Sequence, residues 1–235
     1  MMVTPSFFNC PNGLKQGCIM SPILFSYLVQ EITTEIRRRG GNGIQLFPGA
    51  AEIAILLFAD DIVLIADTVP ELQKKMNVLF ETAYKLGLII NMDKSKVVVF
   101  RKGGHLAAHE KWFIGNKQLL VVNQYCYLGL IYSSTLSSNI MMTNLAARAH
   151  TASVMVLRSL VKLQNISTSV LFKILDTQIQ PILLYGAEIW GMDNCNVLEN
   201  IHLYAMKRFL RVPIFTPNMM IYGDTGCRLI QLYGP

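Results

Sequence analysis

The stretch that decides the fold is Phe58-Ala59-Asp60-Asp61, which lies between the apolar runs Ala54-Ile55-Leu56-Leu57 and Ile62-Val63-Leu64-Ile65. Two adjacent carboxylates interrupt sequence that hydrophobicity would otherwise bury, and a buried charge is costly unless it is paired or bound to a metal. Mg²⁺ is a hard ion that takes one or two carboxylates and leaves its other positions to water and substrate phosphates. The pattern therefore predicts two short strands joined by a turn that carries a metal site.

A turn is needed at this place for a geometric reason. Neighbouring side chains on a strand point to opposite faces, so two adjacent aspartates can approach one cation only where the backbone turns. A hairpin apex meets this requirement and leaves both carboxylates accessible. The plain alternative is a solvated Asp-Asp turn that binds nothing, and the dipeptide alone does not decide between the two.

The sequence around the turn predicts alternating helices and strands. Upstream, Ser21-Pro22 is an N-cap followed by proline, and it begins a helix over about 22–38 that glycines from Gly40 onward end. Downstream, Thr68 and Glu71 have capping-box spacing for a helix that Gly87 stops. We expect strands at 44–47, 51–58, 62–66, 89–90, 97–100 and 125–132.

From Ser138 onward the apolar residues recur at helical spacing. We expect helices at about 139–163, 168–184 and 195–211, with Pro181 kinking or ending the second. The expected fold class is therefore α+β, with a boundary near residue 136.

The composition restricts the class of protein. With 235 residues, 52% hydrophobic and 15% charged, the chain is expected to fold. The richest apolar window, Ile53 to Ala66, is cut by the aspartates, so no membrane span is expected. Five scattered cysteines without a CxxC pair, and no signal-peptide pattern, predict an intracellular protein, nuclear or cytoplasmic and not secreted. A net charge of +6 is compatible with binding nucleic acid, while nothing indicates an oligomeric state.

A second stretch gives the aspartates a context. Gly13-Leu14-Lys15-Gln16-Gly17-Cys18-Ile19-Met20-Ser21-Pro22 is a glycine-flanked loop that leads into a capped helix. Such a loop lets the backbone approach a ligand and points amides at negative charge. It resembles motif B of reverse transcriptases, and Phe58 to Asp61 resembles their motif C. Both are similar to the non-LTR retrotransposon (LINE-type) family, whose metal motif typically starts with Phe-Ala-Asp-Asp.

Three further matches follow in the order of that family. Gly87-Leu88-Ile89-Ile90-Asn91 through Lys94 resembles motif D, in which Lys94 or Lys96 would lie near the incoming triphosphate. Tyr125-Cys126-Tyr127-Leu128-Gly129 resembles the primer-grip hairpin, motif E. Pro181-Ile182-Leu183-Leu184-Tyr185-Gly186-Ala187-Glu188-Ile189-Trp190 resembles a segment that commonly follows in animal non-LTR elements.

The resemblance implies an architecture and a reaction. Residues 1–136 would form a partial palm of antiparallel sheet and helices with motifs B to E, residues 137–212 would form a helical thumb, and residues 213–235 stay unassigned. The implied reaction is RNA-directed DNA polymerisation, in which two Mg²⁺ ions hold the primer 3′-hydroxyl and the dNTP phosphates. The implied partners are an RNA template, a DNA primer and dNTP.

The resemblance also implies roles for individual residues. Asp60 and Asp61 would bind metal, with Asp60 the more direct ligand, and Lys94 would complete the catalytic set. The residues that would shape the dNTP and template pocket are Gly13, Gln16, Gly17, Ser21, Pro22, Phe58 and Ala59. Those that would hold the primer end are Tyr127, Leu128 and Gly129.

The third carboxylate of the family site, from motif A, has no match. No aspartate precedes Asp60, and the earlier acids Glu31, Glu35 and Glu52 do not match motif A by position. We therefore expect a truncated enzyme, without fingers or motif A, that does not polymerise alone. The alternative is a non-catalytic nucleic-acid-binding protein derived from such an element. That reading would use the basic residues Arg37, Arg38, Arg39, Lys94, Lys96, Arg148, Arg158, Lys162, Lys207, Arg208 and Arg211. A structural helical adaptor is a third reading.

Overall fold

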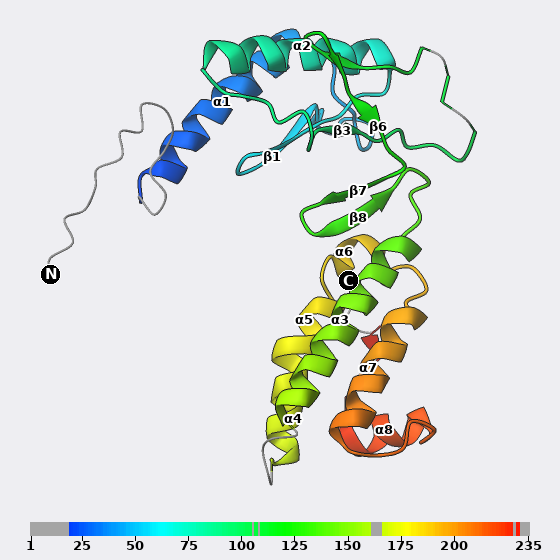
Figure 1. Ribbon diagram of the computed structural model, residues 1–235. Helices are drawn as coiled ribbons and strands as arrows, with labels where there is room; N and C mark the ends of the chain where they lie inside the picture. Colours follow the sequence, from blue (N-terminus) through cyan, green and yellow to red (C-terminus); the bar gives the residue numbers. More distant parts are fainter. Residues whose placement is uncertain (1–18, 105, 108, 161–165, 228, 231–235) are drawn as a thin grey trace, which may run out of the picture. The chain divides into compact units, whose positions relative to one another are not determined.

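The computed structural model describes residues 19–104, 106–107, 109–160, 166–227 and 229–230 (Figure 1). These residues form two compact units. The first contains the described residues up to Val97 and those from 106 to 121, and the second contains residues 98–104 and the described residues from Val122 onward. Each unit has its own hydrophobic core.

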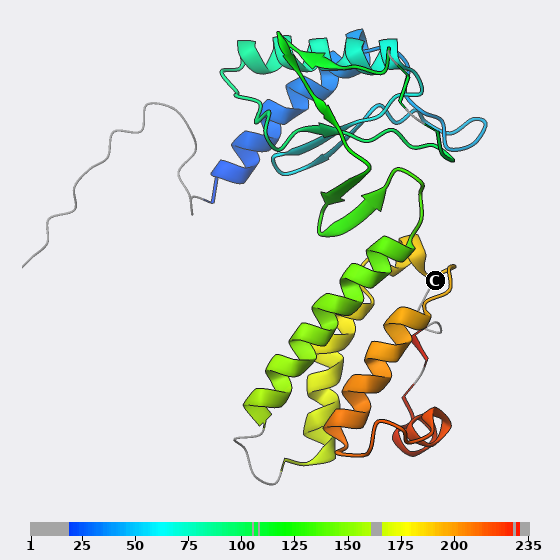
Figure 2. The same cartoon turned by 45° about the vertical axis from the view of Figure 1, so that its right-hand side comes forward.

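The first unit packs two helices on one side of a β-hairpin (Figures 1 and 2). Its elements are α1 (Ser21–Arg39), β1 (Ile55–Phe58), β2 (Asp61–Leu64), α2 (Val69–Lys85), β3 (Lys96–Val97), β4 (Phe113–Ile114), β5 (Lys117–Gln118) and β6 (Leu120–Val121). The buried residues of its core are Ile32, Ile36, Ala54, Ile55, Val78 and Leu79. The apolar residues of α1, α2 and the hairpin therefore share one interior.

Helix α1 confirms the predicted helix but corrects its start. The helix begins at Ser21, with Met20 at the N-cap position and Pro22 in the first turn. Ser21 is thus the first helical residue rather than the cap, and Pro22 is tolerated because the N–H groups of a first turn have no helical partner. At the other end, Arg38 and Arg39 pair with Glu35 at 2.8 and 3.4 Å.

Helix α2 confirms both of its predicted signals. The Thr68 hydroxyl accepts a hydrogen bond from the Glu71 N–H at 3.4 Å. At the C-terminus, Gly87 has φ +69° and donates to the Tyr84 carbonyl, while Leu88 donates to the Ala83 carbonyl at 2.8 Å. This pair of bonds is the Schellman motif, which glycine favours because it adopts positive φ without strain.

Several of the strands predicted before residue 101 are wrong or shorter. Residues 44–47 contribute a single bridge, Ile44 to Ile53, and residues 89–90 and 98–100 have irregular backbone. Ile89 is 96% exposed, so this apolar pair did not mark a buried strand. What remains of the predicted 97–100 strand is β3, which pairs in parallel with β6.

The side chain of Gln73 in α2 makes two hydrogen bonds with the backbone of β4. The Gln73 amide donates to the Phe113 carbonyl at 2.7 Å and accepts from the Phe113 N–H at 2.8 Å. The side-chain amide thus takes the place of a neighbouring strand's backbone.

The second unit combines a hairpin with a helical bundle. Its elements are β7 (Gln124–Tyr127), β8 (Leu130–Ser133), α3 (Asn139–Leu160), α4 (Thr168–Ile174), the π-helical turn η1 (Leu175–Ile179), α5 (Gln180–Leu183), α6 (Ala187–Trp190), α7 (Asn196–Phe209) and α8 (Asn218–Thr225). The core lies between α3, α7 and the α4–η1–α5 segment, as Figure 2 shows. The hairpin therefore belongs to the same compact unit as the helices.

The helical predictions for this unit are confirmed in the described residues, with two refinements. Residues 161–163, the expected end of the first helix, lie outside the described residues. Pro181 does not end the second helix at its own position, because it lies in the first turn of α5, directly after the π-helical turn. A π-helical turn changes the local hydrogen-bond register, which accommodates a residue without an N–H. The short helix α8 lies in the segment that the sequence left unassigned. The α+β class is confirmed, and no helix in the described part of the chain is long and apolar enough to cross a membrane.

Candidate functional site

The aspartates lie at a two-residue hairpin turn. Phe58 pairs with Asp61, which leaves Ala59 and Asp60 to connect the strands. Ala59 has φ +51°, a left-handed conformation that costs a non-glycine residue on the order of 1 kcal/mol. Two-residue hairpins need positive φ in the loop to match the strand twist, so the strain follows from the tightness of the turn.

The two carboxylates come from different parts of the hairpin. Ile62 and Leu64 pack against the core, so the alternation of a strand places Asp61 on the opposite face. Its partner Phe58 lies on that face too and is 60% exposed. Asp60 belongs to the turn itself, and both carboxylates are solvent-exposed. The arrangement offers two accessible oxygen donors side by side in sequence.

Two carboxylates suit a hard divalent cation, whose remaining coordination positions would be filled by water and phosphate oxygens. Among the residues that the structure describes, no three His, Cys, Asp or Glu side chains form a group that could hold a metal ion. Two of the three earlier acids are engaged elsewhere: Glu35 pairs with arginines of α1, and Glu52 accepts from the Gly43 N–H at 2.9 Å. The turn therefore fits part of a metal site.

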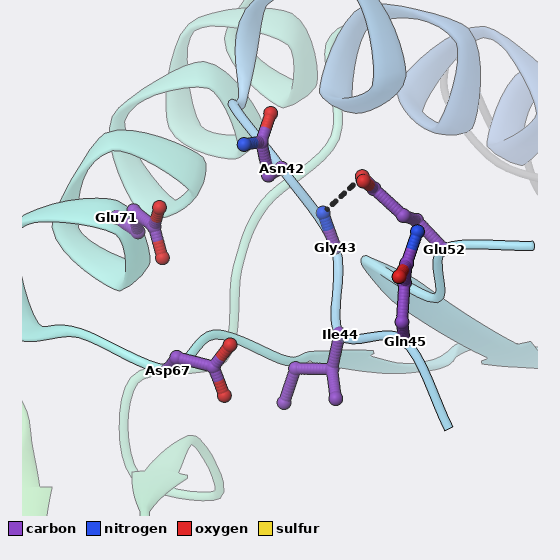
Figure 3. Close-up of a pocket in the computed structure, with 7 residues that line it drawn as sticks. All are labelled: Asn42, Gly43, Ile44, Gln45, Glu52, Asp67 and Glu71. Atoms are coloured by element: carbon purple, nitrogen blue, oxygen red, sulfur yellow. Dashed lines mark hydrogen bonds between the residues drawn. The ribbon is translucent and has the colours of Figure 1, made fainter. Parts of the chain in front are cut away.

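A pocket of about 480 Å³ lies at the other end of the hairpin (Figure 3). Its lining residues are Asn42, Gly43, Ile44, Gln45, Glu52, Asp67 and Glu71. None of them belongs to the turn, so the pocket is separate from the aspartate pair.

A fully buried lysine of α2 joins the segments around this pocket. The Lys75 ammonium donates to the carbonyls of Asn42 and Ile65, each at 2.6 Å. Burial lowers the Lys75 pKa, and the nearby carboxylates of Glu71 and Asp67 oppose that shift. Its bonds hold the loop after α1 and the exit of β2 on α2, which is a structural role.

The loop that carries Lys94 is well formed. The Asn91 side-chain oxygen accepts from the N–H groups of Asp93 and Lys94, each at 3.1 Å. The Asn91 carbonyl accepts from the Ser95 N–H at 3.0 Å. Local bonding of this kind competes with strand formation. Lys94 is exposed, whereas Lys96 is half-buried in β3.

The β7–β8 hairpin carries the residues predicted to hold a primer end. Its loop residues Leu128 and Gly129 have φ +48° and +79°, the signs of a type I′ turn. Tyr127 is half-buried, and its ring lies 6.4 Å from that of Tyr132. These residues belong to the second unit, and the aspartates belong to the first.

The remaining predicted residues divide between described and undescribed parts. Ser21 and Pro22 lie in the first turn of α1, half-buried and exposed respectively. Gly13, Gln16 and Gly17 lie outside the described residues.

Sequence reasoning missed two side chains that contact the β7–β8 turn. The Tyr185 hydroxyl donates to the Leu128 carbonyl at 2.7 Å, and the Arg148 guanidinium donates to the Gly129 carbonyl at 3.1 Å. Tyr185 lies in a segment that the sequence singled out by resemblance, whereas Arg148 was named only as one of several basic residues, and no sequence signal points to its contact with the turn. Lys75 was missed as well, because a lysine at a buried helix position looks like any surface lysine.

Comparison with known proteins decides the family. Residues 2–132 match the family described as reverse transcriptase (RNA-dependent DNA polymerase). The chain belongs to the reverse transcriptase family. The match ends in β8 and includes both the aspartate turn and the β7–β8 turn. Reverse transcriptases of this family generally use a divalent metal ion, in agreement with the carboxylate donors.

Two relatives of this chain come from retrotransposons. It is 26% identical over 233 residues to a retrovirus-related Pol polyprotein from type-1 retrotransposable element R2 of Popillia japonica, covering 94% of the chain and 36% of the relative. It is 27% identical over 130 residues to the R2 polyprotein of Nasonia vitripennis, covering 52% of the chain and 12% of the relative. These similarities confirm the resemblance to non-LTR retrotransposon reverse transcriptases. The chain thus spans about a third or less of the length of these relatives.

Proposed function

We propose that the Asp60–Asp61 turn is the metal-binding part of an RNA-directed DNA polymerase site of a non-LTR retrotransposon. The observation that carries the proposal is the pair of exposed carboxylates at a strained two-residue turn, in a chain that belongs to the reverse transcriptase family. A magnesium ion bound there would stabilise negative charge on dNTP phosphates. In this proposal Asp60 is the more direct ligand and Asp61 its partner.

The other predicted residues take roles around that turn. Lys94, presented by the Asn91 loop, lies near the triphosphate, with Lys96 as the alternative. The residues that shape the dNTP and template pocket are Gly13, Gln16, Gly17, Ser21, Pro22, Phe58 and Ala59. Tyr127, Leu128 and Gly129 hold the primer end. Residues 1–136 and 137–212 correspond in this proposal to palm and thumb, and the partners are RNA template, DNA primer and dNTP.

The proposal includes inactivity of the 235-residue chain on its own. Two observations support it: no aspartate precedes Asp60, and the described residues contain no three-ligand group. Loss of a residue that coordinates the metal directly lowers the rate of the catalysed reaction by orders of magnitude. Purified chain with an RNA template, a DNA primer, dNTP and Mg²⁺ is expected to give no extension. Template-directed incorporation would refute this part of the proposal.

Metal binding by the turn is tested separately from polymerisation. Mn²⁺, which resembles Mg²⁺ in its oxygen ligands, broadens the NMR signals of nearby residues. We expect broadening at Phe58 to Ile62 that Asp60→Asn reduces at least several-fold. Asp67→Asn, in the acidic pocket, is the matched control and is expected to leave that broadening unchanged. Broadening that depends on Asp67 instead of Asp60 would assign the ion to the pocket.

A second candidate function is nucleic-acid binding without chemistry, which the surface of α3 and α7 favours. The rings of His150 and Tyr204 lie 5.0 Å apart between these helices. Four exposed arginines lie on α3, on α7 or just after α7: Arg148, which also donates to the Gly129 carbonyl, Arg158, Arg208 and Arg211. Arginine side chains can bind a phosphate backbone, and aromatic rings can stack on unpaired bases.

Not every basic residue proposed for that role is available. The Lys207 ammonium is buried and donates to the Ile214 carbonyl at 2.9 Å and the Asn218 side-chain oxygen at 2.8 Å. Arg39 pairs with Glu81 at 2.6 Å, and Lys162 lies outside the described residues. Steeply salt-dependent binding of RNA without incorporation would favour this second function, and no binding at low salt would exclude it.

An intracellular location, nuclear or cytoplasmic, belongs to the same proposal. The three cysteines that the structure describes, Cys126, Cys195 and Cys227, are free thiols, as is usual where glutathione keeps proteins reduced.

A further inference from the structure

The segment from Pro181 to Trp190, which resembles a segment of animal non-LTR elements, contacts the turn of the β7–β8 hairpin. The Tyr185 hydroxyl donates to the Leu128 carbonyl at 2.7 Å, although 57 residues separate them in the sequence. From α3, the Arg148 guanidinium donates to the next carbonyl, that of Gly129, at 3.1 Å. Both carbonyls of the two-residue loop therefore have a side-chain donor from outside the hairpin.

The glycines of the two segments allow this close approach. A Cβ on Gly129 would lie 3.5 Å from the Tyr185 ring, at a backbone φ of +79°. A Cβ on Gly186 would lie 2.5 Å from a methyl group of Leu130, which is closer than real contacts allow. At Gly129 an added Cβ would make only an ordinary contact, so the positive φ is what favours glycine there, whereas at Gly186 there is no room for a side chain.

The backbone of Tyr185 is bonded to a core residue of the same unit. Its carbonyl accepts a hydrogen bond from the Trp190 indole at 3.0 Å, and Trp190 is 1% exposed in the core of the unit. On the other side, burial raises the pKa of Tyr132, and the nearby Tyr127 and Tyr185 raise it further. Tyr185 therefore connects the buried core to the turn of the hairpin.

The turn needs such support because its first residue is not glycine. Leu128 has φ +48°, a conformation that non-glycine residues adopt only where the surroundings impose it. An isolated two-stranded hairpin is also marginally stable in water. The two external donors and the glycine contacts supply the surroundings that hold this conformation.

We propose that Tyr185 and Arg148 are positioning residues that hold the Leu128–Gly129 turn in the shape with which it receives the primer end. This inference rests on the proposed function, in which that turn contacts the primer. It gives the Pro181–Trp190 segment a role. The segment supplies Tyr185, which bonds to the turn, and Trp190, which bonds to the Tyr185 carbonyl from the core.

The test compares two tyrosine variants of the full chain. Tyr185→Phe removes the hydroxyl that donates to Leu128. Tyr222→Phe, the matched control, removes a buried hydroxyl of the same unit that has no hydrogen-bond partner among the described residues. Binding is measured by fluorescence anisotropy with a DNA primer on an RNA template, once with a recessed 3′ end and once blunt. Hydrogen exchange of residues 124–133 reports the hairpin directly.

We expect the wild-type chain to prefer the recessed end. Tyr185→Phe should reduce that preference about fivefold and speed exchange in the hairpin by a similar factor, as loss of one hydrogen bond implies. It should leave blunt-duplex affinity and melting temperature unchanged, which loss of the fold would not. Arg148→Lys, which keeps the charge but not the planar donor, should act in the same direction. Tyr222→Phe should match the wild type in every measurement.

The outcomes separate the inference from the function on which it rests. A wild-type chain that binds both duplexes equally refutes the proposed primer contact, and the positioning role with it. A wild-type chain that prefers the recessed end, with Tyr185→Phe and Arg148→Lys keeping that preference, refutes the positioning role alone. Unchanged hydrogen exchange in both variants also refutes it, because the two side chains then do not stabilise the hairpin.

Discussion

The second unit should lose stability in mild acid because of one buried histidine. His202 is 1% exposed on α7, and burial lowers its pKa from 6.5 to about 4. Among the described residues its Nδ1 atom is buried without a hydrogen-bond partner, and burial is what disfavours the charged form. The unfolded chain binds a proton at this histidine below about pH 6.5, whereas the folded chain does so only below about pH 4.

The sign and size of the effect follow from that difference. Because the folded-state pKa is the lower one, stability is fully present above pH 6.5 and falls as the pH drops toward 4. The complete difference is worth about 3 kcal/mol, of which about 2 kcal/mol is lost between pH 7 and 4.5. Glu199, one turn away on α7, has its pKa raised by burial and acts in the opposite direction. A variant is therefore needed to separate the contribution of His202 to the pH dependence of stability from that of Glu199.

The assay is urea unfolding of the full chain at pH 7 and pH 4.5, followed by tryptophan fluorescence and by hydrogen exchange of α7. His202→Gln keeps a polar side chain of similar size but does not titrate, so we expect it to lose about 2 kcal/mol less than wild type between the two pH values. His150→Gln, at an exposed position of the same unit, is the control and should keep the wild-type pH dependence. Equal pH dependence of wild type and His202→Gln would refute the reasoning.

Two further predictions concern the fold of each unit. Lys75→Met removes two charge-assisted hydrogen bonds from a fully buried position and should destabilise the first unit by about 2 to 4 kcal/mol, measured by urea unfolding. The exposed neighbour Lys74→Met should change it by less than about 0.5 kcal/mol, and equal effects of the two would contradict the structural role. Gly186→Ala should cost the second unit about 2 to 4 kcal/mol, because φ is +71° and the new Cβ would press on buried Leu130. Gly223→Ala, in an open helical position, should be neutral or stabilising, and a thermal melt that ranks the two glycine variants the other way would exclude this account.

Signals within a few residues of one another were predictable from sequence. The start and end of α2 are both encoded locally, by Thr68 with Glu71 and by Gly87, and both were confirmed. The aspartate turn was predictable for the same reason, because two apolar runs flank a polar pair. Such signals act through bonds that span only a few residues and depend little on the rest of the fold.

Features that depend on distant partners were not predictable in this way. The parallel pairing of β3 with β6 is set by the intervening chain, and Ile89-Ile90 looked like a strand although Ile89 has no buried face. The contact between Tyr185 and Leu128 spans 57 residues, and no residue pattern encodes it. Whether a polar side chain such as Lys75 is buried likewise depends on which carbonyls the fold brings to it.

The double hydrogen bond between Gln73 and Phe113 has a practical consequence for engineering. In the described residues β4 and β5 pair only with each other, and the Gln73 side chain bonds β4 to α2. The turn of this hairpin, around Asn116, therefore does not set the pairing of any other strand. A peptide tag or a fluorescent label inserted after Asn116 would therefore lengthen a loop tip and leave the aspartate hairpin untouched. That position gives the first unit a reporter site for ligand binding, and retention of the Gln73 contact, read by hydrogen exchange at Phe113, would verify that the insertion is silent.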